Sequence, residues 1–104
     1  VLVNLGGIAN LTRLRAGCGL DDVIAFDTGP ANCIGDALCR RLDPTGPGYD
    51  AAGDLASRGR VIESVVSDVL AADYFIRPHP KSTDGPAMIA PFDDAVRRLA
   101  PGAS

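Results

Sequence analysis

Apolar residues open the chain in two short runs that flank a pair of glycines. Residues 1–5 are rich in valine and leucine and apolar at all but one position, which is typical of a strand buried on both faces. Gly6 and Gly7 follow, and glycine accepts the positive φ that tight two-residue hairpins need. The pattern therefore predicts a hairpin whose returning strand covers residues 8–15.

A third apolar run, residues 23–26, ends at the carboxylate of Asp27. It is short and β-rich, so we expect it to join the hairpin in one sheet. Residues 28–32, Thr-Gly-Pro-Ala-Asn, predict a tight turn, with Pro30 suited to the first helical position. Apolar residues then recur three and four positions apart, which predicts a helix over residues 31–42. They are Ile34, Ala37, Leu38 and Leu42.

The second half of the chain alternates helix breakers with helical patterns. Residues 43–48 are rich in proline and glycine and end the first helix, and residues 49–59 can hold a short one. A wide apolar stripe over residues 61–72 predicts another helix in spite of its β-branched residues. Residues 77–86 predict a long irregular loop, and residues 92–99 a last short helix.

Composition places the chain among globular proteins and excludes several functions. It has 104 residues, 46% hydrophobic and 22% charged, which is one domain by length. A net charge of −3 without a basic block argues against nucleic acid as a partner. No stretch approaches the roughly 18 apolar residues of a membrane span. Because the first residue already lies in a predicted strand, we expect a piece of a longer protein.

The cysteines and the single histidine form no metal-ligand pattern. Cys18, Cys33 and Cys39 contain no C-x-x-C pair, which predicts reduced thiols in a cytosolic protein rather than a zinc site. His79 lies between two prolines and is interpreted as a loop residue. No metal site and no Ser/His/Asp triad is predicted.

Three polar segments are candidate binding loops. They are Asn4-x-Gly6-Gly7-x-x-Asn10, Asp27-Thr28-Gly29-Pro30-x-Asn32 and Lys81-Ser82-Thr83. In the second, a carboxylate ends a buried strand just before a helix N-terminus, where α/β sheets bind ligands and N–H groups attract anions. Asp27 and Asn32 can therefore hold sugar hydroxyls, with an anion on the backbone between them. The alternative is that Asp27 or Thr28 only caps the helix.

The other segments carry weaker signals. The N–H groups of Gly6 and Gly7 can form an anion-binding nest, although an ordinary hairpin explains two glycines more simply. Lys81 can neutralise a phosphate or carboxylate, whereas most lysines in polar loops are solvated. Tyr49 and Asp50 can clamp a substrate, but a turn followed by a helix cap explains them better.

Four stretches in order resemble the motifs of one family, the anhydro-N-acetylmuramic acid kinases. They are Asn4-Leu-Gly-Gly-Ile-Ala-Asn-Leu-Thr12, Phe26-Asp-Thr-Gly-Pro-Ala-Asn32, Tyr49-Asp-x-x-Gly53-x-x-Ala56-x-x-Gly59-x-Val61 and Pro80-Lys-Ser-Thr83. Two departures are visible. Ala31 stands where the family usually has glycine, and residues 84–86, Asp-Gly-Pro, replace the usual Gly-Arg-Glu.

The resemblance implies an α/β fold of the actin/hexokinase-like (ribonuclease H-like) type. Residues 1–104 would then be a partial lobe of a two-lobed sugar kinase, with a mixed sheet and flanking helices. It also implies ATP- and Mg²⁺-dependent conversion of 1,6-anhydro-N-acetylmuramic acid to N-acetylmuramic acid 6-phosphate, for peptidoglycan recycling in a bacterial cytoplasm. The partners would be the amino sugar and ATP, with a homodimer as a candidate assembly. The alternatives are a non-catalytic fragment and another sugar or acetate kinase of the same superfold.

Two groups of residues take roles by the same resemblance. The group expected at the phosphates of the nucleotide is Gly6, Gly7 and Asn10. The group expected at the substrate is Asp27, Thr28, Gly29, Asn32 and Lys81. The family's catalytic Asp and first phosphate loop lie upstream of this stretch and its adenosine contacts largely downstream, so no catalytic residue is assigned here.

Overall fold

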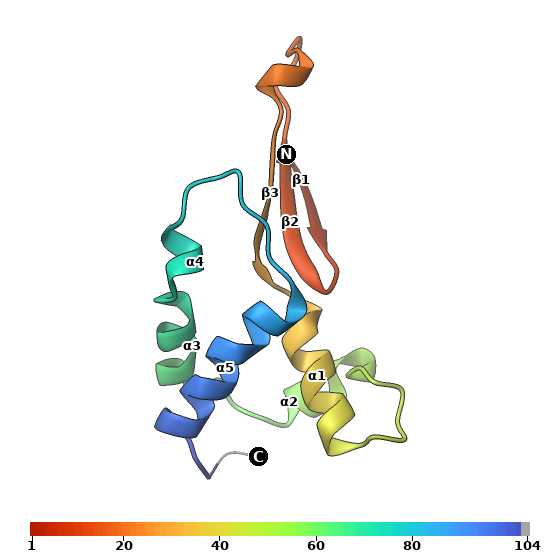
Figure 1. The fold of residues 1–104 in the computed structure, drawn as a ribbon. Helices are drawn as coiled ribbons and strands as arrows, with labels where there is room; N and C mark the ends of the chain where they lie inside the picture. Colours follow the sequence, from red (N-terminus) through yellow and green to blue (C-terminus); the bar gives the residue numbers. More distant parts are fainter. Residues whose placement is uncertain (103–104) are drawn as a thin grey trace.

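The computed structural model describes residues 1–102 of the chain. In that part, a sheet lies at one end of the molecule and most of the helices lie at the other (Figure 1). The strands are β1 (Leu2–Leu5), β2 (Ile8–Arg13) and β3 (Ile24–Pro30), and the helices are α1 (Asn32–Leu42), α2 (Asp54–Ser57), α3 (Glu63–Leu70), α4 (Asp73–Ile76) and α5 (Gly85–Leu99). Short 3-10 turns lie at Leu20–Asp22 and Ala51–Gly53.

The strands form one antiparallel sheet in the order β1-β2-β3. Gly6 and Gly7 connect β1 to β2, so the predicted hairpin and the predicted three-stranded sheet are confirmed. The resemblance implied a mixed sheet, but the described residues contain only antiparallel pairs. A parallel pair needs a long crossover to a further strand, and no strand follows α1 in this part of the chain.

The helices confirm the predicted pattern except at two boundaries. The stripe over residues 61–72 is helical only in α3, and α4 follows as a separate short helix. Helix α5 begins at Gly85 rather than at Phe92, which shortens the predicted loop. The cause is a cap: the Asp84 carboxylate accepts a first-turn N–H at 2.8 Å, and Pro86 lies in that turn, where its missing N–H costs nothing.

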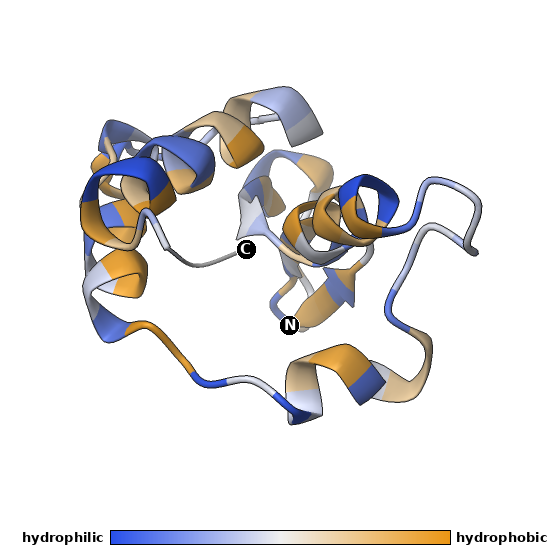
Figure 2. Ribbon diagram, turned by 90° about the horizontal axis from the view of Figure 1, so that it is seen from below, coloured by the Kyte–Doolittle hydropathy of each residue, from blue (hydrophilic) through white to orange (hydrophobic). Residues whose placement is uncertain are grey.

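Strand β1 is exposed, so the prediction of burial on both faces is wrong. Val3 and Leu5 keep 62% and 69% of their surfaces exposed, because β1 is an edge strand that the described helices leave uncovered. Hydrophobic residues on the helices, orange on the ribbon in Figure 2, are in part exposed as well, among them Leu70 and Ile76. The radius of gyration is 16.0 Å, whereas a compact domain of this length has about 13 Å. The described residues therefore bury little apolar surface for their number.

Helices α1, α3 and α5 border an open apolar groove of about 880 Å³, the helix groove. Its lining includes Leu38, Val61, Val65, Val66, Phe92 and Val96. Two ion pairs hold the helices around it: Arg41 with Asp93 at 2.8 Å joins α1 to α5, and Arg98 with Asp68 at 2.6 Å joins α5 to α3. Because all four side chains are partly exposed to solvent, these pairs hold the helices only weakly.

Candidate functional site

The second polar segment forms part of β3, so the predicted turn is wrong. The β2–β3 register shifts there: Ala9 pairs with Gly29, whereas Asn10 pairs with Asp27. Thr28 is thus the extra residue of a β-bulge, and its Oγ1 donates a hydrogen bond to the carbonyl of Ala9 at 3.2 Å. Glycine and proline suggested a break, but both are tolerated at a bulge in an edge strand such as β3. The bulge lets β3 run directly into α1.

The Gly6-Gly7 hairpin holds the N-terminus of α1. The N–H groups of Asn32 and Cys33, the first two residues of the helix, donate to the carbonyls of Gly6 and Gly7 at 2.9 and 3.0 Å. Helix N-termini normally leave these donors unpaired. Here they are occupied, so they are not free for the anion predicted between β3 and the helix.

The backbone of the hairpin differs from the predicted one. Neither Gly6 nor Gly7 has a positive φ, contrary to the prediction for a tight two-residue turn. The trans peptide between them directs the N–H of Gly7 opposite to the carbonyl of Gly6, and therefore away from α1. Apart from Gly7 and its two chain neighbours, no described residue has an atom within 4 Å of the position that a Cβ on Gly7 would occupy. A ligand can approach the backbone closely at this point.

Three polar residues form one cross-strand row of the sheet. Asn4 in β1 pairs with Asn10 in β2, and Asn10 pairs with Asp27 in β3. Directly paired residues of antiparallel strands project from the same face, so the first two polar segments share one surface. The sequence placed Asn4 in the first candidate loop but assigned it no contact, and the strand register is what brings it into one row with Asp27.

The third polar segment is tied to Asp27. The N–H of Thr83 donates to Asp27 Oδ2 at 2.9 Å, and the N–H of Asp27 donates to the carbonyl of Lys81 at 3.1 Å. The N-cap of α1 is Ala31, without any capping side chain, so the alternative in which Asp27 or Thr28 caps the helix is wrong. The carboxylate instead holds a segment that lies 56 positions away in sequence.

Lys81 is half-buried rather than solvated. Its Nζ donates to the carbonyl of Tyr74 at 2.9 Å and lies 4.6 Å from the centre of the Tyr74 ring, a cation–π distance. The Tyr74 hydroxyl donates to the carbonyl of Asp27 at 2.5 Å. Tyr74 has no role in the sequence prediction and lies just beyond the predicted helix over residues 61–72. Its one signal was an aromatic pair, Tyr74-Phe75, in a chain with 5% aromatic residues.

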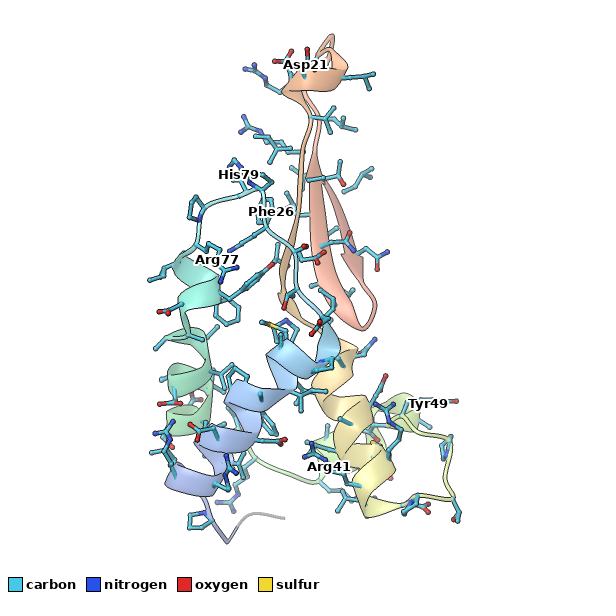
Figure 3. All side chains as sticks on the ribbon, viewed as in Figure 1. Asp21, Phe26, Arg41, Tyr49, Arg77 and His79 are labelled. Atoms are coloured by element: carbon cyan, nitrogen blue, oxygen red, sulfur yellow. The ribbon has the colours of Figure 1, made fainter. Side chains whose placement is uncertain are left out.

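An aromatic stack fastens the loop between α4 and α5 to β3. The rings of Phe26 and His79 lie nearly parallel with their centres 5.3 Å apart (Figure 3). His79 is thus a loop residue, as predicted, and it packs against β3 one residue before Asp27. The stack and the Asp27 hydrogen bonds hold the same loop along the same strand.

Asn32 faces a second cavity, of about 620 Å³, whose lining also includes Asp36 and Tyr49. The Asp50 carboxylate beside it accepts two backbone N–H groups of α2 at 2.9 and 3.0 Å. These bonds hold the pKa of Asp50 below its ordinary value. The interpretation of Tyr49 and Asp50 as a turn followed by a helix cap is therefore confirmed.

At this site the described residues supply a single carboxylate rather than a set of metal ligands. Among residues 1–102, no three His, Cys, Asp or Glu side chains gather as a metal site. Asp27 offers one carboxylate, and one of its oxygens already accepts the N–H of Thr83. Mg²⁺ is often held by one or two carboxylates together with substrate phosphates, and a single carboxylate is compatible with that arrangement.

Comparison with known sequences decides the family. The sequence profile described as "Anhydro-N-acetylmuramic acid kinase" matches residues 1–92. The chain belongs to this family. Proteins of that name from Clostridioides difficile and Salinibacter ruber are 44% and 51% identical to it over 82 residues, 79% of the chain. One from Gloeobacter violaceus is 51% identical over 80 residues, 77% of the chain.

The chain spans about a fifth of the length of these anhydro-N-acetylmuramic acid kinases, 20% or 21%. The family profile covers all three polar segments and ends inside α5. The resemblance found in the motifs is thereby confirmed. None of the helices described is both long and apolar enough to span a membrane.

Proposed function

We propose that the full-length protein carrying this chain transfers the γ-phosphoryl group of ATP to 1,6-anhydro-N-acetylmuramic acid. Water opens the anhydro bridge while O6 takes the phosphoryl group, so the products are N-acetylmuramic acid 6-phosphate and ADP. One observation carries the proposal: the bond from Thr83 to Asp27 joins the third polar segment to the surface shared by the other two. The relatives from Clostridioides difficile and Salinibacter ruber are named for the same amino sugar.

The proposal includes an actin/hexokinase-like fold in which residues 1–104 form part of one of two lobes. Exposed β1 and the open helix groove support it, because both are apolar surfaces that would be covered by further protein. A cytoplasmic location, a role in peptidoglycan recycling and a homodimeric assembly belong to the same proposal. Size-exclusion chromatography of the full-length protein tests the assembly.

Gly6, Gly7 and Asn10 are proposed to face the phosphates of ATP. The open backbone at Gly7 supports this, because a phosphate can approach an N–H group closely where no side chain intervenes. Bound Mg²⁺ would neutralise phosphate charge, and Asp27 is the carboxylate that fits it. Phosphoryl transfer depends mainly on such positioning and charge neutralisation.

The residues proposed at the sugar are Asp27, Thr28, Gly29, Asn32 and Lys81. Asp27 offers a carboxylate oxygen to a sugar hydroxyl or to ordered water. The bulge at Thr28 sets the direction of that carboxylate. Lys81 contributes positive charge close to the site while Tyr74 fixes its position. The Asn32 side chain lines the neighbouring cavity, and its amide N–H donates to the carbonyl of Leu5 at 3.4 Å.

The substitution Asp27→Asn in the full-length protein tests the proposal. The amide can still accept the N–H of Thr83, so the fold should remain, but it cannot supply a charged acceptor to the reacting groups. Losing a charge-assisted contact costs on the order of 2–4 kcal/mol, or tens- to several-hundred-fold in kcat/KM. Steady-state kinetics beside a thermal melt measures both effects.

The matched control is Asp21→Asn, the same chemical change at the far tip of the β2–β3 arm (Figure 3). It should leave kcat/KM and Tm at the wild-type values. Wild-type kcat/KM for Asp27→Asn, with a normal Tm, would reject the proposed role of Asp27.

A further inference from the structure

Three segments meet around Tyr74 in a closed circuit of hydrogen bonds. The Tyr74 hydroxyl donates to the carbonyl of Asp27 at 2.5 Å, and the N–H of Asp27 donates to the carbonyl of Lys81 at 3.1 Å. Lys81 Nζ closes the circuit by donating to the carbonyl of Tyr74 at 2.9 Å. The circuit joins β3, α4 and the loop before α5. Movement of any one segment therefore breaks its hydrogen bonds to the other two.

The ring next in sequence presses on the same stretch of β3. A Cβ on Gly29 would lie 2.7 Å from Cε1 of Phe75, so only glycine admits this contact without a shift. Gly29 is buried, and Tyr74 is only 7% exposed. Two adjacent residues of α4 therefore hold β3 on either side of Thr28, one by a hydrogen bond and one by packing.

Tyr74 is well placed to donate but not to react. Burial, and then the charge of Asp27, raise the pKa of Tyr74 above its ordinary value of 10.0. Its hydroxyl is therefore protonated throughout the neutral range, and its proton is directed at a backbone carbonyl. Because the hydroxyl is already engaged and the ring is buried, a direct contact with substrate is not its role.

We propose that Tyr74 is a positioning residue of the Asp27 site. Its hydroxyl fixes the backbone of Asp27, and the backbone bond from Asp27 to Lys81 carries this constraint to the loop whose Thr83 N–H orients the carboxylate. Its ring and carbonyl hold the ammonium of Lys81. This inference rests on the proposed function for the importance of Asp27, but the positioning itself can be measured without activity.

The test uses the full-length protein with Tyr74→Phe, which removes the hydroxyl and keeps the ring for packing and for Lys81. Losing one part-buried hydrogen bond to the site should lower kcat by about tenfold, with KM for the sugar within twofold of wild type. Hydrogen exchange of the Asp27 and Thr83 amides should accelerate by a similar factor. Ser57→Ala, which removes a hydroxyl bond to a backbone carbonyl in α2, should change neither quantity.

A double-mutant comparison separates positioning from a general loss of stability. If Tyr74 acts through Asp27, Tyr74→Phe should lower kcat less than twofold further in an Asp27→Asn background. Multiplicative losses, or unchanged exchange at both amides, would overturn the positioning role. Tyr74→Leu removes the ring as well, so it should also raise KM, and Phe should restore that KM.

The outcomes also separate this inference from the proposed function. If Asp27→Asn leaves activity unchanged while Tyr74→Phe accelerates exchange at Asp27 and Thr83, the positioning stands and the proposed function fails. If Asp27→Asn lowers activity and Tyr74→Phe changes neither kcat nor exchange, the proposed function stands and the positioning role fails.

Discussion

The junction around Asp27 and the helix groove differ in how completely their side chains find partners within the described residues. At the junction, β3, α4 and the loop before α5 are joined by hydrogen bonds of 2.5–3.1 Å around a buried tyrosine. Around the groove, about 880 Å³ of apolar-lined space stays open, and exposed ion pairs join the helices. The described residues pair the polar groups of the first region and leave apolar surface of the second exposed.

The difference follows from the two kinds of interaction. A hydrogen bond is directional and needs one partner at one distance, which a short segment can supply. Hydrophobic stabilisation grows with buried area, and small chains bury a smaller fraction of their surface than large ones. A chain that spans about a fifth of its relatives can therefore preform part of a site without the core that would stabilise it.

The largest effect is expected from removing the rest of the protein. We expect the 104-residue chain alone neither to phosphorylate 1,6-anhydro-N-acetylmuramic acid nor to bind ATP appreciably, because the proposed two-lobed cleft would need a second lobe. Radiolabelled ATP with the purified chain measures transfer. Counts above a blank without protein would show that the junction is sufficient for phosphoryl transfer. The exposed apolar surface of the helix groove would then not mark the chain as incomplete for activity.

A smaller effect is expected at the packed side of the junction. Gly29→Ala puts a methyl group 2.7 Å from the ring of Phe75, and such overpacking costs about 1–3 kcal/mol of unfolding free energy. Denaturant melts of the full-length protein measure the loss. Gly35→Ala is the matched control, because its site in α1 is open and alanine favours a helix by roughly 0.5–1 kcal/mol.

Equal melts for both glycine variants would contradict the tight packing at Gly29. The double variant Gly29→Ala/Phe75→Leu sharpens the test. A smaller side chain at position 75 should recover part of the lost stability if the contact with the ring is the cause.

The smallest loss of stability is expected from a substitution in the ion pair beside the helix groove. Arg41 holds the pKa of Asp93 below its ordinary 3.8, chiefly through their hydrogen bond. A lowered pKa means that the pair stabilises the fold above about pH 4. The contribution is then lost as the pH falls through the folded-state value. Asp93→Asn should therefore lower Tm slightly at pH 7 and not at all at pH 2.

High salt gives a second test of the ion pair between Arg41 and Asp93. At 1 M NaCl the difference in Tm between wild type and Asp93→Asn at pH 7 should shrink, because exposed charges are screened. If Asp93→Asn lowered Tm at pH 7 as much as Gly29→Ala does, the ion pair between Arg41 and Asp93, rather than apolar packing, would be what holds α5 to α1.

Local pattern determined the elements of this chain. Residues 1–26 predict three strands, and the spacing from Ile34 to Leu42 predicts α1, because side-chain periodicity follows directly from backbone geometry. The two errors concern properties that depend on neighbouring elements. β1 is exposed because no described layer covers it, and β3 continues through Gly29 and Pro30 because an edge strand tolerates a bulge. Neither condition can be read from local sequence.

The family, too, was determined by sequence alone, since four ordered motifs were enough to identify it and the profile match confirms them. Only the tertiary structure brought those motifs together. Strand register placed Asn4, Asn10 and Asp27 in one row, and a hydrogen bond across 56 positions attached Thr83 to them. The sequence did not predict the contacts of Tyr74, because its hydrogen-bond partners lie 47 positions before it and 7 after it. The local sequence around a residue does not specify contacts at such separations.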